Sequence, residues 1–194
     1  MAKPKKKAQT KIIALVGMVG SGKSEAARFF SEEGFPVLRF GQITDEGIEK
    51  RKLPLGEKSE RAVREDLRKE LGMGAYAVLL EPKINEALKD TSVLILDGLY
   101  SWEEYIYLKN RFKGLLLLAV YCRPELRYQR VRNRKIRPLT PKTARERDTA
   151  QLLNLNKAGP IAIADYLIEN SGSKSDLKQK VKEFLGEFIR EDPR

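Results

Sequence analysis

The stretch that decides the fold is residues 11–24, KIIALVGMVGSGKS. Its first part, KIIALV, is an apolar, β-branched run of the length of a buried strand. The second part, GMVGSGKS, matches the pattern G-x-x-x-x-G-K-[ST], and helix-forming side chains follow in residues 24–33. In this order of strand, glycine loop and helix, loop amides surround an anion and the helix start adds its positive dipole end. The segment therefore predicts a phosphate-binding loop, or P-loop.

Each position of the loop has an expected task. The glycines let the backbone curl around an anion, Lys23 would reach the β- and γ-phosphates of a nucleotide, and the Ser24 hydroxyl would bind Mg²⁺. The residues expected to contact the nucleotide are Gly17, Gly20, Ser21, Gly22, Lys23, Ser24 and Glu25. The alternative is a glycine-rich turn that ends in Lys-Ser by chance. The complete motif in its proper setting argues against that alternative.

The rest of the chain alternates short apolar runs with helical patterns. Strands are predicted at residues 11–17, 36–40, 92–97, 115–121 and 166–169. Helices are predicted at residues 24–33, 44–52, 58–71, 75–89, 102–112, 124–134, 143–155 and 175–190. This alternation predicts an α/β fold in three layers, with a five-stranded parallel sheet and helices on both faces. Because no linker or repeat interrupts it, residues 11–194 are expected to form one domain after a flexible basic tail, residues 1–10.

Parallel sheets bind ligands at the carboxyl ends of their strands, so the residues just after each strand are candidates for a site. Asp97 ends the run VLILD. A P-loop needs a carboxylate on a neighbouring strand to position its metal, and we expect Asp97 to have this catalytic role. The alternative, an ordinary aspartate that ends a strand before Gly98, is the usual interpretation where no P-loop is present.

Composition excludes several classes of site. The 194 residues include no histidine, which removes His-based triads and His-containing zinc sites, and one cysteine, which cannot form an intrachain disulfide or a thiolate cluster. The default for such a chain is the cytoplasm. The longest apolar stretch, residues 115–122, is much shorter than the roughly 20 residues of a membrane span. We therefore expect no membrane-spanning helix.

Positive charge is concentrated in one segment. The net charge is +11, and residues 123–147 carry +8 of it, with ten basic and two acidic side chains. Most of the basic side chains are arginine rather than lysine. Arginine grips phosphate with two parallel hydrogen bonds, and phosphoryl transfer depends chiefly on positioning and charge neutralisation. Some of these arginines are expected to close over a transferred phosphoryl group, while at least half are expected to be solvated or structural.

With these motifs in place, the chain resembles the P-loop nucleotide kinases, especially adenylate-kinase-related proteins and dephospho-coenzyme A kinases. Residues 17–24 with 30–37 (FSEEGFPV) are similar to the dephospho-coenzyme A kinase opening, and residues 96–98 (LDG) are similar to the aspartate-glycine of adenylate kinases. Residues 164–172 (ADYLIENSG) resemble the closing strand and loop of both groups. The resemblance implies a P-loop NTPase fold with a short arginine-rich helical lid, and ATP and Mg²⁺ as ligands.

The same resemblance implies roles for residues beyond the P-loop. Asn170 and Gly172 would lie beside the adenine base, with Arg130 close to it. Arg134 would reach phosphate, and Arg145 and Arg147 would be further arginines of a lid at about residues 130–150. Arg134 and Arg147 therefore join Lys23 and Asp97 as the expected catalytic residues.

The sequence departs from both groups at the acceptor side, expected at about residues 41–90. Asp45 stands where an adenylate-kinase relative has a phosphate-gripping arginine, and residues 39–42 (RFGQ) replace the Asp-Ala-Asp of dephospho-coenzyme A kinases. One hypothesis is that Asp45 binds an acceptor hydroxyl while Arg61, Arg64 or Arg68 grips an anion. The alternative is that Asp45 caps a helix and the arginines form a solvated face.

These observations favour a kinase that moves the γ-phosphoryl group of ATP onto a nucleotide or nucleotide-like small molecule. An alternative acceptor is dephospho-coenzyme A. A rival from another class is a nucleotide-sensing or RNA-binding P-loop module without turnover, which the high pI of about 9.7 favours mildly. Nucleic acid is the less favoured partner, because no basic stripe with interleaved aromatic residues is present. The sequence leaves the oligomeric state open.

Overall fold

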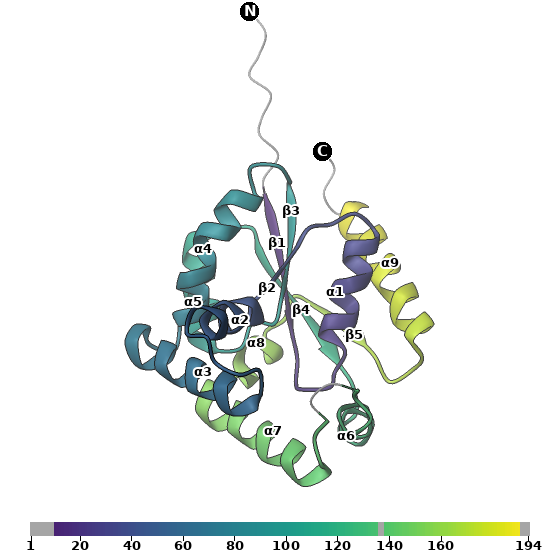
Figure 1. Ribbon diagram of the computed structural model, residues 1–194. Helices are drawn as coiled ribbons and strands as arrows, with labels where there is room; N and C mark the ends of the chain where they lie inside the picture. The colour runs from purple at the N-terminus through teal and green to yellow at the C-terminus, as the bar shows by residue number, and fades with distance from the viewer. Residues whose placement is uncertain (1–9, 136–137, 191–194) are drawn as a thin grey trace, which may run out of the picture.

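The computed structural model describes residues 10–135 and 138–190. The lysines of the basic tail, which lie within residues 3–7, and Arg137 of the arginine-rich segment lie outside the described residues. Figure 1 shows a central sheet with helices on both of its faces. The predicted α/β class and three-layer arrangement are confirmed.

The sheet has five strands in the order β2-β3-β1-β4-β5, and every neighbouring pair is parallel. The strands are β1 (Lys11–Val16), β2 (Val37–Arg39), β3 (Val93–Asp97), β4 (Leu115–Tyr121) and β5 (Tyr166–Glu169). The three central strands are almost fully buried because helices cover them on both sides, which explains why they are apolar without alternation.

Nine helices lie in the described ranges 10–135 and 138–190: α1 (Lys23–Glu32), α2 (Gly41–Lys50), α3 (Glu57–Leu71), α4 (Ala75–Ala87), α5 (Trp102–Arg111), α6 (Pro124–Arg132), α7 (Pro141–Leu155), α8 (Ala158–Ala162) and α9 (Lys174–Arg190). One core cluster packs α1 and α9 on the sheet through side chains such as Phe30 and Phe184. On the opposite face, α4 contributes Tyr76, Leu80 and Ile84 to a second cluster. None of the described helices combines the length and the apolar character that a membrane span requires.

The structure corrects several predicted boundaries. Helix α2 begins at Gly41 rather than at residue 44, and α6 ends at Arg132 rather than at residue 134. Helix α7 begins at Pro141 because the Thr140 hydroxyl accepts a hydrogen bond from the Thr143 amide. Helix α8 is absent from the prediction, since five residues are too few to show a helical period.

The strand register places the expected functional segments at one edge. Leu15 of β1 and Arg39 of β2 both pair with Asp97 of β3, and the end of β4 pairs with the end of β5. The P-loop, Asp97 and the loop after β5 therefore emerge side by side at the carboxyl edge of the sheet, where α/β folds bind ligands.

Candidate functional site

The P-loop is held in a conformation that its glycines permit. Gly20 and Gly22 have φ angles of 78° and 104°. A Cβ atom on Gly20 would lie 2.8 Å from the Arg127 carbonyl oxygen, and one on Gly22 would lie 2.1 Å from Nδ2 of Asn170. The loop therefore packs directly against α6 and against the segment after β5, and a side chain at either glycine would collide with them.

Lys23 is turned back onto this loop. Its Nζ donates hydrogen bonds to the carbonyl oxygens of Gly17 (2.9 Å) and Met18 (3.1 Å). The pKa of Lys23 is lowered to about 8, chiefly by burial; the charges of nearby arginines add to this lowering, and Asp97 opposes it. A phosphate placed in the loop would supply a negatively charged partner for this ammonium and would favour its protonated form.

The residues present fit a magnesium ion held largely by a nucleotide. Asp97 is 4% exposed at the end of β3, and Ser24 lies in the first turn of α1. Within residues 10–135 and 138–190 no group of three or more Asp, Glu, Cys or His could hold a metal ion. Mg²⁺ commonly takes only one or two protein oxygens and completes its shell with phosphates and water. The hydroxyl of Ser24 and the carboxylate of Asp97 match that donor set.

A cavity of about 750 Å³ opens beside the P-loop; we call it the donor cavity. Its lining includes most of the predicted nucleotide contacts: Gly20, Gly22, Lys23, Ser24, Glu25, Arg130, Arg134, Asn170 and Gly172. The structure thus brings together residues that lie up to about 150 positions apart in the sequence. Gly17 and Ser21 lie deeper in the loop, and the Ser21 hydroxyl is buried without a hydrogen-bond partner in the described chain.

Two of the predicted base contacts also brace the site. Arg130 donates hydrogen bonds to the carbonyl oxygens of Asn170 (2.8 Å) and Gly172 (3.0 Å). The Asn170 side-chain amide donates to the Ser21 carbonyl at 2.7 Å, so this amide is already used to fasten the loop after β5 to the P-loop. Arg130 and Asn170 therefore fix one wall of the donor cavity through contacts within the protein.

Arg127 is the functional residue that sequence reasoning missed. It is 5% exposed, forms two hydrogen bonds to the Asp148 carboxylate (3.1 and 2.7 Å) and donates to the Val19 carbonyl at 2.9 Å. The Tyr128 hydroxyl also donates to Asp148. This network joins α6, α7 and the P-loop. No local pattern reveals it, because the ion pair spans 21 residues and the third contact spans 108.

Arg134 and Arg147 lie near enough for their charges to act on each other and on Lys23. Burial lowers the pKa of Arg134, and so does the neighbouring charge of Arg147. Both arginines also help to lower the pKa of Lys23. Three cations close together form a site for a strongly negative group. Arg145, the other expected lid arginine, packs instead with its guanidinium 5.9 Å from the Tyr128 ring centroid.

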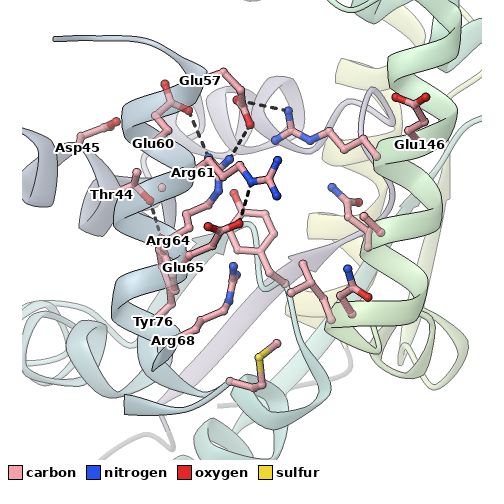
Figure 2. Close-up of a pocket in the computed structure, with 18 of the residues that line it drawn as sticks. Thr44, Asp45, Glu57, Glu60, Arg61, Arg64, Glu65, Arg68, Tyr76 and Glu146 are labelled. Carbon is pink, nitrogen blue, oxygen red and sulfur yellow. Dashed lines mark hydrogen bonds and ion pairs between the residues drawn. The ribbon is translucent and has the colours of Figure 1, made fainter. Parts of the chain in front are cut away.

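A second cavity, of about 790 Å³, lies between α3 and α7; we call it the acceptor cavity. Figure 2 shows the charged side chains of α3 on one side and Glu146 of α7 on the other. Its lining includes the three predicted acceptor residues, Asp45, Arg64 and Arg68. It also includes Arg147, Tyr100, Gln151 and the hydrogen-bonded pair Thr44 and Tyr76.

The predicted acceptor residues differ in their surroundings. Asp45 forms an ion pair with Arg39 and lies in the second turn of α2, so the expectation that it caps a helix is wrong. Arg64 is held by Glu57 (2.6 Å) and Glu60 (3.4 Å). Arg68 places its guanidinium 5.2 Å from the Tyr76 ring centroid, and its buried Nε has no hydrogen-bond partner in the described chain.

The alternative of a solvated arginine face holds for one of the three arginines. The Arg61 side chain is 71% exposed and pairs with Glu65, as that alternative expects. The Arg64 side chain is only 23% exposed, and Arg68 is half-buried, so neither belongs to a solvated face.

Comparison with known proteins places the chain in a family. The sequence profile of a family described as an AAA domain matches residues 13–154. A UPF0200 protein of Thermococcus kodakarensis is 35% identical over 182 residues, which are 92% of this chain and 98% of the relative. The chain belongs to the UPF0200 family. A second UPF0200 member, from Pyrococcus horikoshii, is 33% identical over 94% of this chain and all of its own length.

Solved structures show that this UPF0200 chain has a P-loop kinase-like fold. TT1252 from Thermus thermophilus aligns with a TM-score of 0.62 at 22% identity, covering 92% of this chain and 98% of its own. A shikimate kinase from Acinetobacter baumannii aligns at 0.60 and 18% identity, covering 96% and 97%. A dephospho-CoA kinase from Campylobacter jejuni aligns at 0.54 and 15%, covering 93% and 98%. The predicted P-loop fold is confirmed.

Proposed function

We propose that this UPF0200 chain is an ATP-dependent phosphotransferase that moves the γ-phosphoryl group of ATP onto a nucleotide or a nucleotide-like small molecule. One observation carries the proposal: the donor cavity contains Lys23 and Arg134, the acceptor cavity contains Arg147, and the charges of these three residues act on one another. Cations that line the two cavities are thus near enough for their charges to interact. Direct transfer needs two bound ligands whose reacting groups face each other across such a cluster.

On the donor side, the protein would bind the phosphates through the P-loop amides and Lys23. Ser24 and Asp97 would hold Mg²⁺, which when bound neutralises charge on the phosphate oxygens. Arg134 and Arg147 would neutralise the charge that develops on the transferred group. No histidine is required for this chemistry, since positioning and charge neutralisation supply most of the catalysis.

On the acceptor side, the size of the cavity and its mixture of charged and aromatic side chains suit a nucleotide-like ligand. Tyr100 lines this cavity, and its hydroxyl would lie 2.9 Å from a Cβ placed on Gly98, the residue after Asp97. Burial raises the pKa of Tyr100, and the charge of Asp97 raises it further, so this phenol stays protonated at neutral pH. It can therefore donate a hydrogen bond near the transferred group.

Dephospho-coenzyme A remains the alternative acceptor, because its kinase shares this fold and the sequence opening resembles that group. The nucleotide-sensing or RNA-binding alternative is weaker. It leaves the acceptor cavity without a purpose, and two arginines of the basic segment are engaged within the protein: Arg127 is buried in an ion pair and Arg130 braces the loop after β5. Steep loss of RNA affinity with rising salt would support that alternative.

The test is a coupled assay of Mg·ATP turnover with nucleoside monophosphates, nucleosides and dephospho-coenzyme A. We expect one acceptor class to stimulate ADP release well above the rate with ATP alone. Lys23→Ala should lower that turnover by about 10²–10³-fold, because it removes a donor that stabilises transition-state charge. Phosphorylated acceptor should be identified directly by mass spectrometry.

The matched control is Lys89→Ala, which removes a lysine that pairs with Glu86 near the end of α4. It should leave turnover within twofold of wild type, since Lys89 lines neither the donor nor the acceptor cavity. Tight ATP binding with no acceptor-dependent turnover would contradict the proposal. Equal activity of wild type and Lys23→Ala would show that a contaminating kinase is being measured.

A further inference from the structure

A buried lysine stands behind the wall of the acceptor cavity. Lys157 follows the end of α7, where Asn156 adopts a left-handed conformation with φ 48°, and it precedes α8. The residue is only 1% exposed. A lysine is seldom fully buried unless it has a partner, because removing an ammonium from water is costly. Its position therefore indicates a specific task.

Lys157 is joined to Gln151 by two hydrogen bonds. Its backbone N–H donates to the Gln151 carbonyl oxygen, and its Nζ donates to the Gln151 side-chain Oε1, each at 3.2 Å. The same ammonium lies 4.9 Å from the centroid of the Tyr100 ring. Gln151 and Tyr100 both line the acceptor cavity. Lys157 thus supports two of the side chains that the acceptor would touch.

Charged groups surround the Lys157 ammonium on several elements. Burial lowers its pKa well below the ordinary value, and Lys23 and Arg147 lower it further, whereas Glu104 and Asp148 oppose the change. Glu104 is fully buried beneath Tyr100, and its Oε1 has no hydrogen-bond partner in the described chain. These two carboxyl groups favour the protonated amine, although burial raises the pKa of Glu104 itself to about 7.

The contact decides how the Gln151 amide is oriented. Because the Lys157 Nζ donates to the amide oxygen of Gln151, that oxygen faces Lys157 and the amide NH₂ faces away from it. Gln151 is 8% exposed, which leaves the amide little room to turn over. A preorganised donor of this kind discriminates strongly against ligands that cannot accept its hydrogen bond.

We propose that Lys157 is a positioning residue that fixes Gln151 so that its amide N–H groups bind the acceptor, and that Gln151 helps to determine acceptor specificity. The ligand would present a carbonyl oxygen, a ring nitrogen or a phosphate oxygen to this amide. The role of this ligand as a phosphoryl acceptor rests on the proposed function, whereas its binding at Gln151 does not require turnover. A purely structural role would be met as well by methionine, which fills similar space without a buried charge.

The decisive variant is Gln151→Glu. It keeps the shape of the side chain and the contact with Lys157, since a carboxylate pairs with an ammonium, but it removes both N–H donors. We expect ligand affinity in the acceptor cavity to fall about tenfold or more, while ATP affinity stays within twofold. Lys157→Met should have a similar effect by releasing Gln151. The matched control is Gln179→Glu on α9, which should change neither affinity.

The readout is the side-chain amide resonance of Gln151 in ¹H–¹⁵N spectra of the full chain, titrated with nucleoside monophosphates, nucleosides and dephospho-coenzyme A. A shift of this resonance, with binding weakened in Gln151→Glu, supports the inference. If no compound shifts it, or if Gln151→Glu binds as tightly as wild type, the inference is wrong. A compound that binds through Gln151 without being phosphorylated would overturn the proposed function and leave the inference standing.

Discussion

The donor and acceptor cavities are similar in volume, about 750 and 790 Å³, but they are built in different ways. The core of the donor cavity is a continuous loop, in which the backbone and Lys23 would bind the proposed ligand. The wall of the acceptor cavity is made of side chains from α2, α3, α4 and α7, some of which pair across elements, such as Thr44 with Tyr76 and Arg147 with Glu57. One is specified by a motif and the other by tertiary contacts.

The two cavities also differ in how far their cations are already neutralised by acidic side chains. An anion in the P-loop meets backbone donors and a cation that lacks a full carboxylate partner, so charge neutralisation favours binding. A ligand in the acceptor cavity meets arginines that are largely neutralised by acids. Arg39, Arg61 and Arg64 each pair with a carboxylate. Among these four arginines, Arg68 is therefore the one whose charge is least neutralised by acidic side chains. Acceptor recognition therefore depends on a small number of side chains.

The largest effect is expected where the two cavities share their support. Arg127→Met would leave the buried Asp148 carboxylate without its bidentate partner and would detach α6 from the Val19 carbonyl. We expect the free energy of unfolding to fall by about 3–5 kcal/mol, as measured by urea denaturation. Ligand affinity should fall in both cavities, since the network joins the P-loop to α7.

Adding Asp148→Leu to Arg127→Met should restore much of that stability, because the stranded charge is removed. Arg28→Met is the control: Arg28 pairs with Glu25 and Glu32 on the surface of α1, and its loss should cost far less. A small stability loss in Arg127→Met, equal to that of Arg28→Met, would show that the buried pair does not hold the cavities together.

The second effect distinguishes the donor cavity from the acceptor cavity: binding in the donor cavity should depend on pH. Because burial lowers the pKa of Lys23 to about 8, the free protein loses this charge above that pH, and phosphate binding must then restore the proton. The Kd for Mg·ATP should be nearly constant from about pH 6.5 to 7.5 and should rise by up to tenfold per pH unit above about pH 8. Isothermal titration calorimetry in buffers of different ionisation enthalpy would also detect the proton taken up.

Lys23→Arg is the control for this profile, since a guanidinium keeps its charge throughout the range. Its Mg·ATP affinity should be weaker but independent of pH between 7 and 9. A flat wild-type profile, or an equal slope in Lys23→Arg, would assign the pH dependence to another group.

The smallest effect sharpens the acceptor side. Arg68→Gln removes the least compensated of the α3 arginines, and we expect the KM for an anionic acceptor to rise about tenfold or less while the KM for ATP is unchanged. Arg111→Gln, which removes an arginine paired with Glu81 on α5, should alter neither constant. A rise in the KM for ATP with no change in the KM for the acceptor would show that Arg68 acts on the donor cavity rather than on the acceptor cavity.

Some expectations from sequence were met because the relevant contacts are local. The P-loop, the boundaries of β4 and β5, and the position of Asp97 at a strand end all follow from runs of neighbouring residues. Contacts between distant positions were missed, such as the Arg127–Asp148 ion pair, which spans 21 residues. The predicted role of Asp45 toward an acceptor stays a prediction, since Asp45 lines the acceptor cavity while it pairs with Arg39. A helical pattern also cannot distinguish the held Arg64 from the less compensated Arg68.

By itself the sequence determined the α/β class, the parallel sheet and the phosphate-binding loop, because hydrophobic period, glycine placement and strand length act over a few residues. Only the tertiary structure decided which charged side chains are neutralised and which are left to act. Arg127 pairs with Asp148, and Lys157 donates a hydrogen bond to Gln151 and lies 4.9 Å from the Tyr100 ring centroid. In a chain with 34% charged residues, each cation has many potential partners, and chain packing selects among them.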